Sequence, residues 1–412
     1  MSKSRIPRWV SLICLGVGLL VVAIPGLWVY VTATAPKLHP SPREIPSVRN
    51  SPPLQKWAGA VEEGRAIVRT SLSEENLPGL SVAVGINGDI VWAEGFGFAN
   101  LENNLPVTPR HRFRIGTASS LFASAGIGVL VDEGRVKLDD EIQSYVPGFP
   151  AKQWPVTIRQ VMGHVGGIKT EDVDDGVLTS SHCSQTADAV KLFANDRLLF
   201  RPGTEYREST FGWVLLSAVV EAAADKPFTA FLQDRVFRPL GMPDTLKSAE
   251  TEPVAGEATS YYPRFAPNPA LGHPKYGMNP LHRFDYSCYA GASGFLSTPS
   301  DLVRFGMAIN GGKLLRRETV QTLQTPQRLA AGTETGFGLG WEVKTVTLAG
   351  QQARAAGSNG LLWVGTVASL LTFPERGLAV AVTSNVSFAD TSSLSERIAQ
   401  AFAEPGKSPA GK

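Results

Sequence analysis

Cysteine is scarce in this sequence, and paired metal-ligand spacings are missing. The 412 residues include three cysteines, and none belongs to a Cys-x-x-Cys pair of the kind that holds zinc. Cys14 lies in an apolar N-terminal segment, so Cys183 and Cys288 are the only two that can pair outside it. A disulfide between them is permitted but not implied, because sequence does not give their separation. We expect no metal site.

The chain also lacks an excess of charge of one sign. Its 39 basic and 37 acidic residues give a net charge of +2 without a basic stripe, so we expect no nucleic-acid partner. Gly95-x-Gly97 precedes no helix, which excludes a dinucleotide-binding fingerprint, and we expect no cofactor. The 41 glycines and 29 prolines favour a loop-rich mixed α/β fold over a helical bundle or repeat array.

One long apolar run is present, from Trp9 to about Thr32, and it follows Lys3, Arg5 and Arg8. A signal-peptide core has about 7–15 apolar residues, whereas a membrane span needs about 20. Ala33-Thr34-Ala35 resembles a signal-peptidase site, but the proline that follows it favours an uncleaved anchor. Because the basic residues precede the run, we expect the N-terminus to be cytoplasmic.

These features predict five segments. They are a cytoplasmic N-terminus (1–8), a transmembrane anchor (9–32), a proline-rich linker (33–55), a folded domain (56–405) and a disordered tail (406–412). The protein is therefore predicted to be a single-pass protein of the cytoplasmic (inner) membrane, with its domain on the periplasmic or extracytoplasmic side.

The folded part reads as strands at both ends with helices between them. Asn87-Gly88 between two strand-like runs is a strong hairpin signal, since both residues must take positive φ, and Ser209-Thr210 is typical of a helix N-cap. We predict one antiparallel sheet flanked by helices, with a helical subdomain at about 140–290. The predicted helices are 56–75, 119–133, 156–163, 211–224, 227–239 and about 391–403, and the predicted strands are 79–86, 89–96, 367–373 and 378–384.

An ordered set of short motifs along residues 56–403 gives the chain a family resemblance. It resembles the superfamily of class C β-lactamases, penicillin-binding proteins and esterases, especially its mitochondrial lactamase-like branch. The resemblance implies a β-lactamase/transpeptidase-like fold of the α/β (α+β) class. The motifs that carry it are Phe113-Arg114-Ile115-Gly116, Gly134 to Asp140, Val156 to Gln160, His164 to Ile168, Pro202-Gly203-Thr204, Ser209 to Trp213, Pro239 to Met242, Gly294 to Thr298 and Phe337 to Trp341.

The family's first catalytic motif, Ser-x-x-Lys, is altered here. The resemblance implies that a serine and a lysine one helical turn apart form the nucleophile and its activating group. This chain has Thr117 at the nucleophile position and Ser120 at the lysine position. Threonine keeps a hydroxyl, but Ser120 supplies neither base nor positive charge. Taking Ser119 as the nucleophile does not restore the motif, because the residue three positions later is Phe122 and not a lysine.

The other two motifs are also altered. The family's Tyr-x-Asn or Tyr-Ser-Thr is here Glu208-Ser209-Thr210, so a carboxylate replaces the tyrosine that relays protons. For the strand motif Lys-Thr-Gly or His-Thr-Gly, Ala355-Ala356-Gly357 fits best, with both polar groups lost. We expect a shared cleft around Thr117, Ser120 and Glu208, and its predicted lining is Ser119, Ser209, Thr210, Ala355, Ala356 and Gly357. His164 is interpreted as a structural hydrogen-bonding residue.

Three hypotheses follow. The first is a catalytically inactive pseudoenzyme that binds a cell-wall peptide or small molecule, or acts as a scaffold, in the cell envelope. The second is an unorthodox serine/threonine hydrolase of esterase, peptidase or β-lactamase type, using Thr117, Ser119 or Ser120 with Glu208. The third is a purely structural domain with an empty site. Oligomeric state does not follow from the sequence.

Overall fold

A computed structural model describes residues 8–34, 37–170, 176–248, 253–264, 277–362 and 365–403. Most of the predicted cytoplasmic segment and all of the predicted C-terminal tail lie outside these ranges. The helices are α1 Arg8–Thr34, α2 Ala58–Glu74, α3 Ser120–Asp132, α4 Ile158–Met162, α5 Thr186–Lys191, α6 Thr210–Ala224, α7 Phe228–Leu232, α8 Pro299–Asn310, α9 Arg317–Leu323 and α10 Thr391–Ala403.

The strands form one large antiparallel sheet and two small ones. The large sheet has the order β1-β3-β2-β13-β12-β11-β10, with β4 paired to β3 at its side. The small sheets are β5-β9-β6 and β7-β8. The strands are β1 Ser47–Arg49, β2 Gly79–Ile86, β3 Asp89–Asn100, β4 Leu105–Pro106, β5 Phe113–Arg114, β6 Leu246–Lys247, β7 Tyr261–Pro263, β8 Met278–Pro280, β9 Phe295–Ser297, β10 Glu342–Leu348, β11 Gln351–Leu362, β12 Thr366–Phe373 and β13 Leu378–Ser384.

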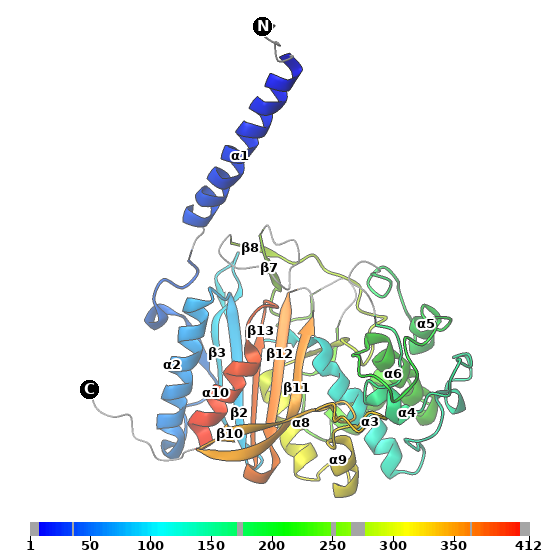
Figure 1. Cartoon of the computed structure of the whole chain (residues 1–412). Helices are drawn as coiled ribbons and strands as arrows, with labels where there is room; N and C mark the ends of the chain where they lie inside the picture. The colour runs from blue at the N-terminus through cyan, green and yellow to red at the C-terminus, as the bar shows by residue number, and fades with distance from the viewer. Residues whose placement is uncertain are drawn as a thin grey trace.

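The large sheet is covered on both faces. Figure 1 shows α2 and α10 on one side of it and α8 and the helical part on the other. Alternate residues of β2 enter different cores: Leu80 and Val82 pack with α2 and α10, whereas Ala83 packs with the helical part. Burial of both faces explains why the central strands read as nearly continuous apolar runs.

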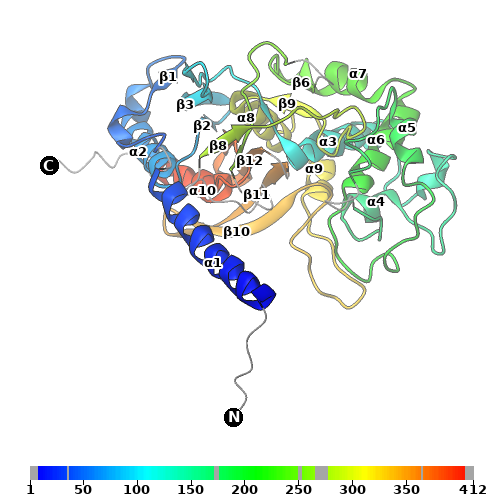
Figure 2. The same cartoon turned by 90° about the horizontal axis from the view of Figure 1, so that it is seen from above.

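The predicted mixed architecture is confirmed. Asn87 and Gly88 have φ of 53° and 99° and join β2 to β3 as a tight turn. The helical part, with α4 to α7, lies at the end of the molecule away from α2 and α10 (Figure 2). The helix expected over 227–239 differs, because α7 ends at Leu232 and a π-helical turn follows over Gln233–Phe237.

Cys183 and Cys288 form a disulfide with their Cα atoms 5.0 Å apart, which resolves the pairing that the sequence left open. The two cysteines are 105 residues apart in the sequence. Closing a loop of that length stabilises the folded state by about 4–5 kcal/mol in the chain-entropy picture. The bond ties the loop before α5 to the loop between β8 and β9.

Helix α1 projects away from the sheet domain (Figure 1). Its side chains between Leu15 and Tyr30, where described, are exposed, including Val22 at 73% and Leu19 at 65%. Within the part of the chain that the structure describes, no helix combines the length and apolar character required to cross a membrane.

Candidate functional site

The candidate site forms where the turn before α3 meets the edge of β11. Strand β5 pairs with β9 and sets the start of this turn, and the Ile115 N–H donates to the Phe295 carbonyl at 3.2 Å. A 3₁₀ turn over Gly116–Ser119 then presents Thr117 toward β11. The Leu361 N–H donates to the Thr117 hydroxyl at 3.2 Å. A hydroxyl and a strand-edge donor thus meet across 244 residues of sequence.

Gly360 permits this contact because it has no side chain. A Cβ at this position would lie 2.3 Å from the Ile115 carbonyl oxygen and 2.4 Å from the Ala118 nitrogen, closer than real contacts allow. The turn and the strand can therefore touch only if glycine stands here. Gly360 closes the tripeptide Ser358-Asn359-Gly360, which ends in glycine as the family's strand motif does.

The tripeptide that the sequence analysis matched to the strand motif, Ala355-Ala356-Gly357, lies away from the contact with Thr117. Gly357 precedes Leu361 by four residues, about 13 Å along a strand, and pairs with Glu342 of β10. Ala355 and Ala356 are fully buried, one in each of the two large cores. Both candidate tripeptides end in glycine. The signal that distinguishes them is that Ser358-Asn359-Gly360 keeps two polar side chains.

Ser119 and Ser120 lie next to Thr117 without forming a hydrogen-bonded pair with it. Ser120 begins α3 and is only 5% exposed. The Ser119 hydroxyl is completely buried and has no hydrogen-bond partner among the described residues. The position where the family carries a lysine thus holds a neutral side chain, and the described part of the site places no ammonium beside Thr117.

Glu208 lies on the segment before α6, where it is exposed. Its carboxylate accepts a hydrogen bond from the Tyr206 hydroxyl at 3.3 Å. Burial raises the pKa of Tyr206, and the charges of Glu208 and Glu342 raise it further. Within the described residues, no hydrogen bond joins Glu208 to Thr117, Ser119 or Ser120. None of the three hydroxyls of the second hypothesis is therefore hydrogen-bonded to Glu208 as a nucleophile to its base.

Ser209 and Thr210 make structural hydrogen bonds. The Ser209 hydroxyl accepts the Gly212 N–H at 2.9 Å and donates to the Lys169 carbonyl at 2.8 Å. The first of these bonds caps α6, which confirms the predicted N-cap. Thr210 is held through Thr170, whose hydroxyl accepts the Thr210 N–H at 3.2 Å. Both residues position α6 through these contacts.

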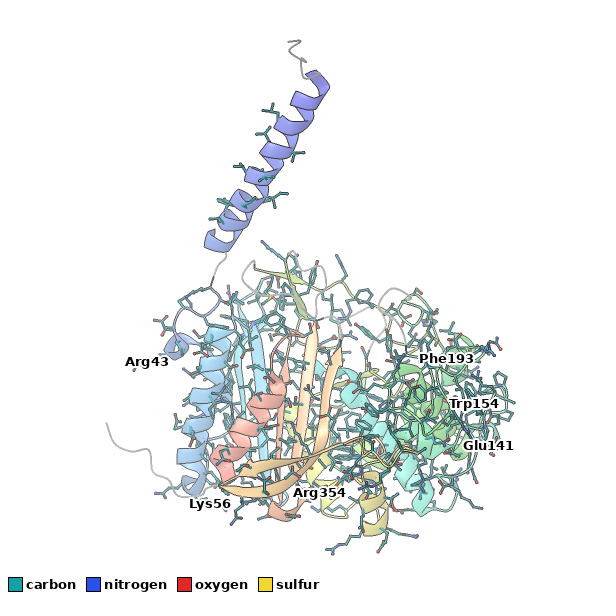
Figure 3. The ribbon with its side chains drawn as sticks, viewed as in Figure 1. Arg43, Lys56, Glu141, Trp154, Phe193 and Arg354 are labelled. Atoms are coloured by element: carbon teal, nitrogen blue, oxygen red, sulfur yellow. A yellow bond between two sulfur atoms is a disulfide. The ribbon has the colours of Figure 1, made fainter. Side chains whose placement is uncertain are left out.

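Glu342 was not identified from the sequence, yet it borders the site. It is the first residue of β10, and its carboxylate accepts the Asn359 N–H at 3.4 Å. Burial raises the pKa of this carboxyl. Neither Glu342 nor Glu208 forms an ion pair with a described residue, and the Arg354 guanidinium instead donates to the Gln324 carbonyl. Figure 3 shows Arg354 near the lower end of β11, on the side of α9.

His164 joins α4 to the segment before α6. The Ser209 N–H points to its Nδ1 at 3.1 Å and the Trp213 Nε1–H to its Nε2 at 3.2 Å. A neutral imidazole has one acceptor nitrogen, so the two donors compete for it, and a protonated ring would face both with N–H groups. Burial lowers the pKa of His164 from 6.5 to about 4. His164 is therefore a neutral, structural residue.

No group of three or more His, Cys, Asp or Glu side chains among the described residues is arranged to hold a metal ion. At the site, Glu208 and Glu342 supply two carboxylates, and no described His, Cys, Asp or Glu joins them as a third metal ligand.

We predict that His164 makes stability depend on pH. Because its pKa is lower in the folded state, the unfolded chain binds the extra proton, and stability is lost as pH falls from 6.5 towards 4. Between pH 7.5 and 5 this amounts to about 2 kcal/mol. The free energy of unfolding, measured with urea, should fall between pH 7.5 and 5 by about 2 kcal/mol less in His164→Asn than in the parent. Exposed His282→Asn is the control, and equal pH dependence in the parent and His164→Asn would contradict the assignment.

Comparisons with known proteins find similarity over most of the folded domain. The family model described as Beta-lactamase matches residues 63–403. Human "Serine beta-lactamase-like protein LACTB, mitochondrial" is 25% identical, over 85% of this chain and 81% of LACTB. The putative penicillin-binding protein PbpX of Bacillus subtilis is 24% identical, over 62% of this chain and 60% of its own length.

A solved structure shares the fold. The D-amino acid amidase of Ochrobactrum anthropi SV3 superposes with a TM-score of 0.69 at 24% identity, covering 83% of this chain and 98% of the amidase. The match of the family model over residues 63–403 includes Thr117, Glu208 and the whole of β11. The chain belongs to the β-lactamase family of serine hydrolase-like proteins.

Proposed function

We propose that this protein is a catalytically inactive member of its family, a pseudoenzyme that binds an extended peptide-like ligand in the cell envelope. The observation that carries the proposal is the environment of Thr117. Its hydroxyl accepts a hydrogen bond from Leu361, and no described residue is bonded to it as a proton acceptor. A hydroxyl needs an adjacent base or an activating charge to become a nucleophile at neutral pH.

None of the titratable groups described around the site is hydrogen-bonded to Thr117 as that base, and the Glu342 carboxylate instead accepts the Asn359 N–H. Tyr206 has a raised pKa, so its phenolate is less available than that of an ordinary tyrosine. His164 has both ring nitrogens directed at Ser209 and Trp213. Glu208 is solvated and bonded to Tyr206. General-base catalysis requires contact with the proton to be removed, and the hydrogen bonds of these groups go to residues other than Thr117. This favours the pseudoenzyme over a hydrolase acting through Thr117, Ser119 or Ser120 with Glu208.

The edge of β11 is suited to hold a peptide. Strand β10 begins at Glu342, opposite Gly357, so it gives β11 no backbone partner beyond that point. The N–H groups of Asn359 and Leu361 point to this open side, where they are bonded to the side chains of Glu342 and Thr117. An extended peptide can replace such side-chain acceptors with its own carbonyl groups by adding a strand to the edge. A cell-wall peptide is one ligand of this form.

We further propose, from the sequence, that the apolar run from Trp9 to about Thr32 anchors the protein in the cytoplasmic membrane with the domain on the extracytoplasmic side. The sequence supports this through the uncharged run from Trp9 to Thr32 and the basic residues before it. The disulfide between Cys183 and Cys288 fits an oxidising compartment. The relative LACTB carries the word mitochondrial in its name, and this chain would share with it a location at a membrane-bounded compartment.

The pseudoenzyme proposal predicts that serine-directed reagents leave the parent protein unmodified. The full chain in detergent is incubated with a labelled penicillin and with a fluorophosphonate, and intact mass is measured. The variant Thr117→Ser, Ser120→Lys, Glu208→Tyr and Ser358→Lys restores a base and positive charges. It should label at least about 100-fold faster than the parent, the contribution typical of acid–base groups. The same variant with Thr117→Ala is the control. A stoichiometric adduct on Thr117, Ser119 or Ser120 of the parent would refute the proposal.

The edge-binding proposal predicts that the Leu361 N–H donates a hydrogen bond to the bound peptide. Binding of diacetyl-Lys-D-Ala-D-Ala is measured by calorimetry on the parent, on Leu361→Pro, which lacks the donor, and on Leu361→Ala, which keeps it. Loss of one hydrogen bond should weaken binding about three- to tenfold in Leu361→Pro only. Near-UV circular dichroism verifies folding. The idea fails if the parent does not bind or if the two variants bind equally.

The anchor proposal predicts that membranes retain the parent protein during alkaline carbonate extraction. Leu19→Arg with Val22→Arg places two charges in the apolar run, each costing about 2.5–3.5 kcal/mol at the centre of a span. This variant should pass into the soluble fraction. Leu54→Arg, which alters an exposed leucine of the linker (61% exposed), should stay with the membrane. Release of the parent itself would show that α1 is no anchor.

A further inference from the structure

The segment that follows α1 is packed on the folded domain, although it belongs to the predicted proline-rich linker. The His39 side chain is buried, and its Nε2 lies 2.8 Å from the Leu77 carbonyl oxygen. The same ring stacks on Phe98, with the two ring centroids 5.8 Å apart. We call residues 37–49 the strap, because they run along the domain and are held to it.

The strap also adds a strand to the large sheet. Its β1 pairs with β3, and Ser47 stands opposite Phe96. The Arg69 guanidinium of α2 donates to the Ser47 hydroxyl at 3.0 Å and to the Arg43 carbonyl at 3.1 Å. Ile45 is buried in the core that lies under α2. Each hydrogen bond contributes about 0.5–1.5 kcal/mol, so several of them together with a buried isoleucine hold the strap in place.

The connection between α1 and the strap is short. Helix α1 ends at Thr34, and two residues separate it from Lys37, where the strap begins. Three steps of an extended chain span at most about 11 Å. Figure 1 shows α1 leaving the domain from the end at which β7 and β8 lie. The strap therefore keeps that end of the domain close to the C-terminal end of α1.

The candidate site lies at the same end of the sheet. The strand registers place one row of residues side by side from the strap to the site: Ser47, Phe96, Leu80, Ser384, Val367 and Leu361. Leu77, which holds His39, comes three residues before Leu80, at most about 10 Å further along the strand direction. From β2 to β11 there are three strand spacings, about 14 Å in all. The Thr117 hydroxyl, bonded to the Leu361 N–H, is therefore near the end of the domain from which α1 leaves.

An apolar side chain is exposed at this end as well. Leu105 of β4 is 46% exposed and stands opposite Asn100, the last residue of β3. Single exposed leucines are common on protein surfaces, so Leu105 does not identify a partner by itself. The short connection does identify one, because a bilayer that holds the apolar run from Trp9 to about Thr32 must lie within a few residues of the strap.

We propose that the membrane surface is the partner of this end of the domain, and that the candidate site opens within reach of the lipid headgroups. The inference rests on the proposed anchor, but it does not depend on whether Thr117 is reactive. The opposite end of the sheet, with the Asn87-Gly88 turn, points away from the bilayer. The eight residues of β2 separate the two ends by about 26 Å.

The test compares two fluorescent labels on the full chain in lipid vesicles that carry a nitroxide quencher on their headgroups. Asn103→Cys places a label in the exposed turn after β3, and Lys313→Cys places one beside Gly88 at the other end of the sheet. Both variants carry Cys14→Ser, so the introduced thiol is labelled, since Cys183 and Cys288 are bonded to each other. Quenching at Asn103 should be at least about twofold stronger than at Lys313, because the ends of the sheet are about 26 Å apart.

An insertion tests whether the short connection causes this difference. Twelve Gly and Ser residues inserted after Ala35 add a flexible chain with a mean span of about 20 Å, so quenching at Asn103 should fall towards that at Lys313. The same insert after Ser2 leaves the connection unchanged and is the matched control. Near-UV circular dichroism verifies that each variant is folded.

The outcomes separate this inference from the proposed anchor. Equal quenching at the two positions, or stronger quenching at Lys313, would overturn the inference while the anchor stands. An unchanged signal at Asn103 after the insertion at Ala35 would also overturn it. If the vesicles do not retain the parent protein, the anchor and this inference are both wrong.

Discussion

The close approach of β11 to the turn before α3 is the contact on which the candidate site depends. Gly360 lets the strand backbone reach Ile115 and Ala118, and this brings the Leu361 N–H to the Thr117 hydroxyl. The contact joins the sheet to the helical part, because the turn leads directly into buried α3. The frame that places a hydroxyl beside a strand-edge donor is therefore intact, whatever chemistry the side chains around it perform.

The side chains around that frame have changed in charge. The lysine position holds Ser120, the strand tripeptide that ends at Gly360 begins with Ser358, and two carboxylates, Glu208 and Glu342, raise the pKa of Tyr206. Family members that act through an acyl-serine need positive charge near the nucleophile, which lowers the cost of removing its proton. In this chain, the side chains named around the Thr117 hydroxyl are neutral or negatively charged. The surroundings thus disfavour formation of an alkoxide while the backbone donors of β11 remain available for hydrogen bonding.

Local features of the sequence predicted local structure well, whereas contacts between distant segments could not be derived from it. Asn87-Gly88 and Ser209 each specify backbone geometry through their own chemistry, and the structure confirms the turn and the cap. The sequence offers two tripeptides that end in glycine, Ala355-Ala356-Gly357 and Ser358-Asn359-Gly360, and only the structure shows that Gly360 packs on Ile115. Glu342 was missed for the same reason, since its contact with Asn359 depends on where β10 begins.

The altered residues also fit the energetics of a folded domain. Ser120 is nearly fully buried, and a lysine there would lose hydration that only close negative or hydrogen-bonding partners could replace. Active sites commonly keep such unfavourable groups at some cost in stability. A neutral serine removes that cost, and Glu208 keeps its charge in water at the surface. In the proposed pseudoenzyme, the strand-edge donors of this relaxed site are held by two side chains, Thr117 and Glu342, and an incoming peptide would need to displace only these.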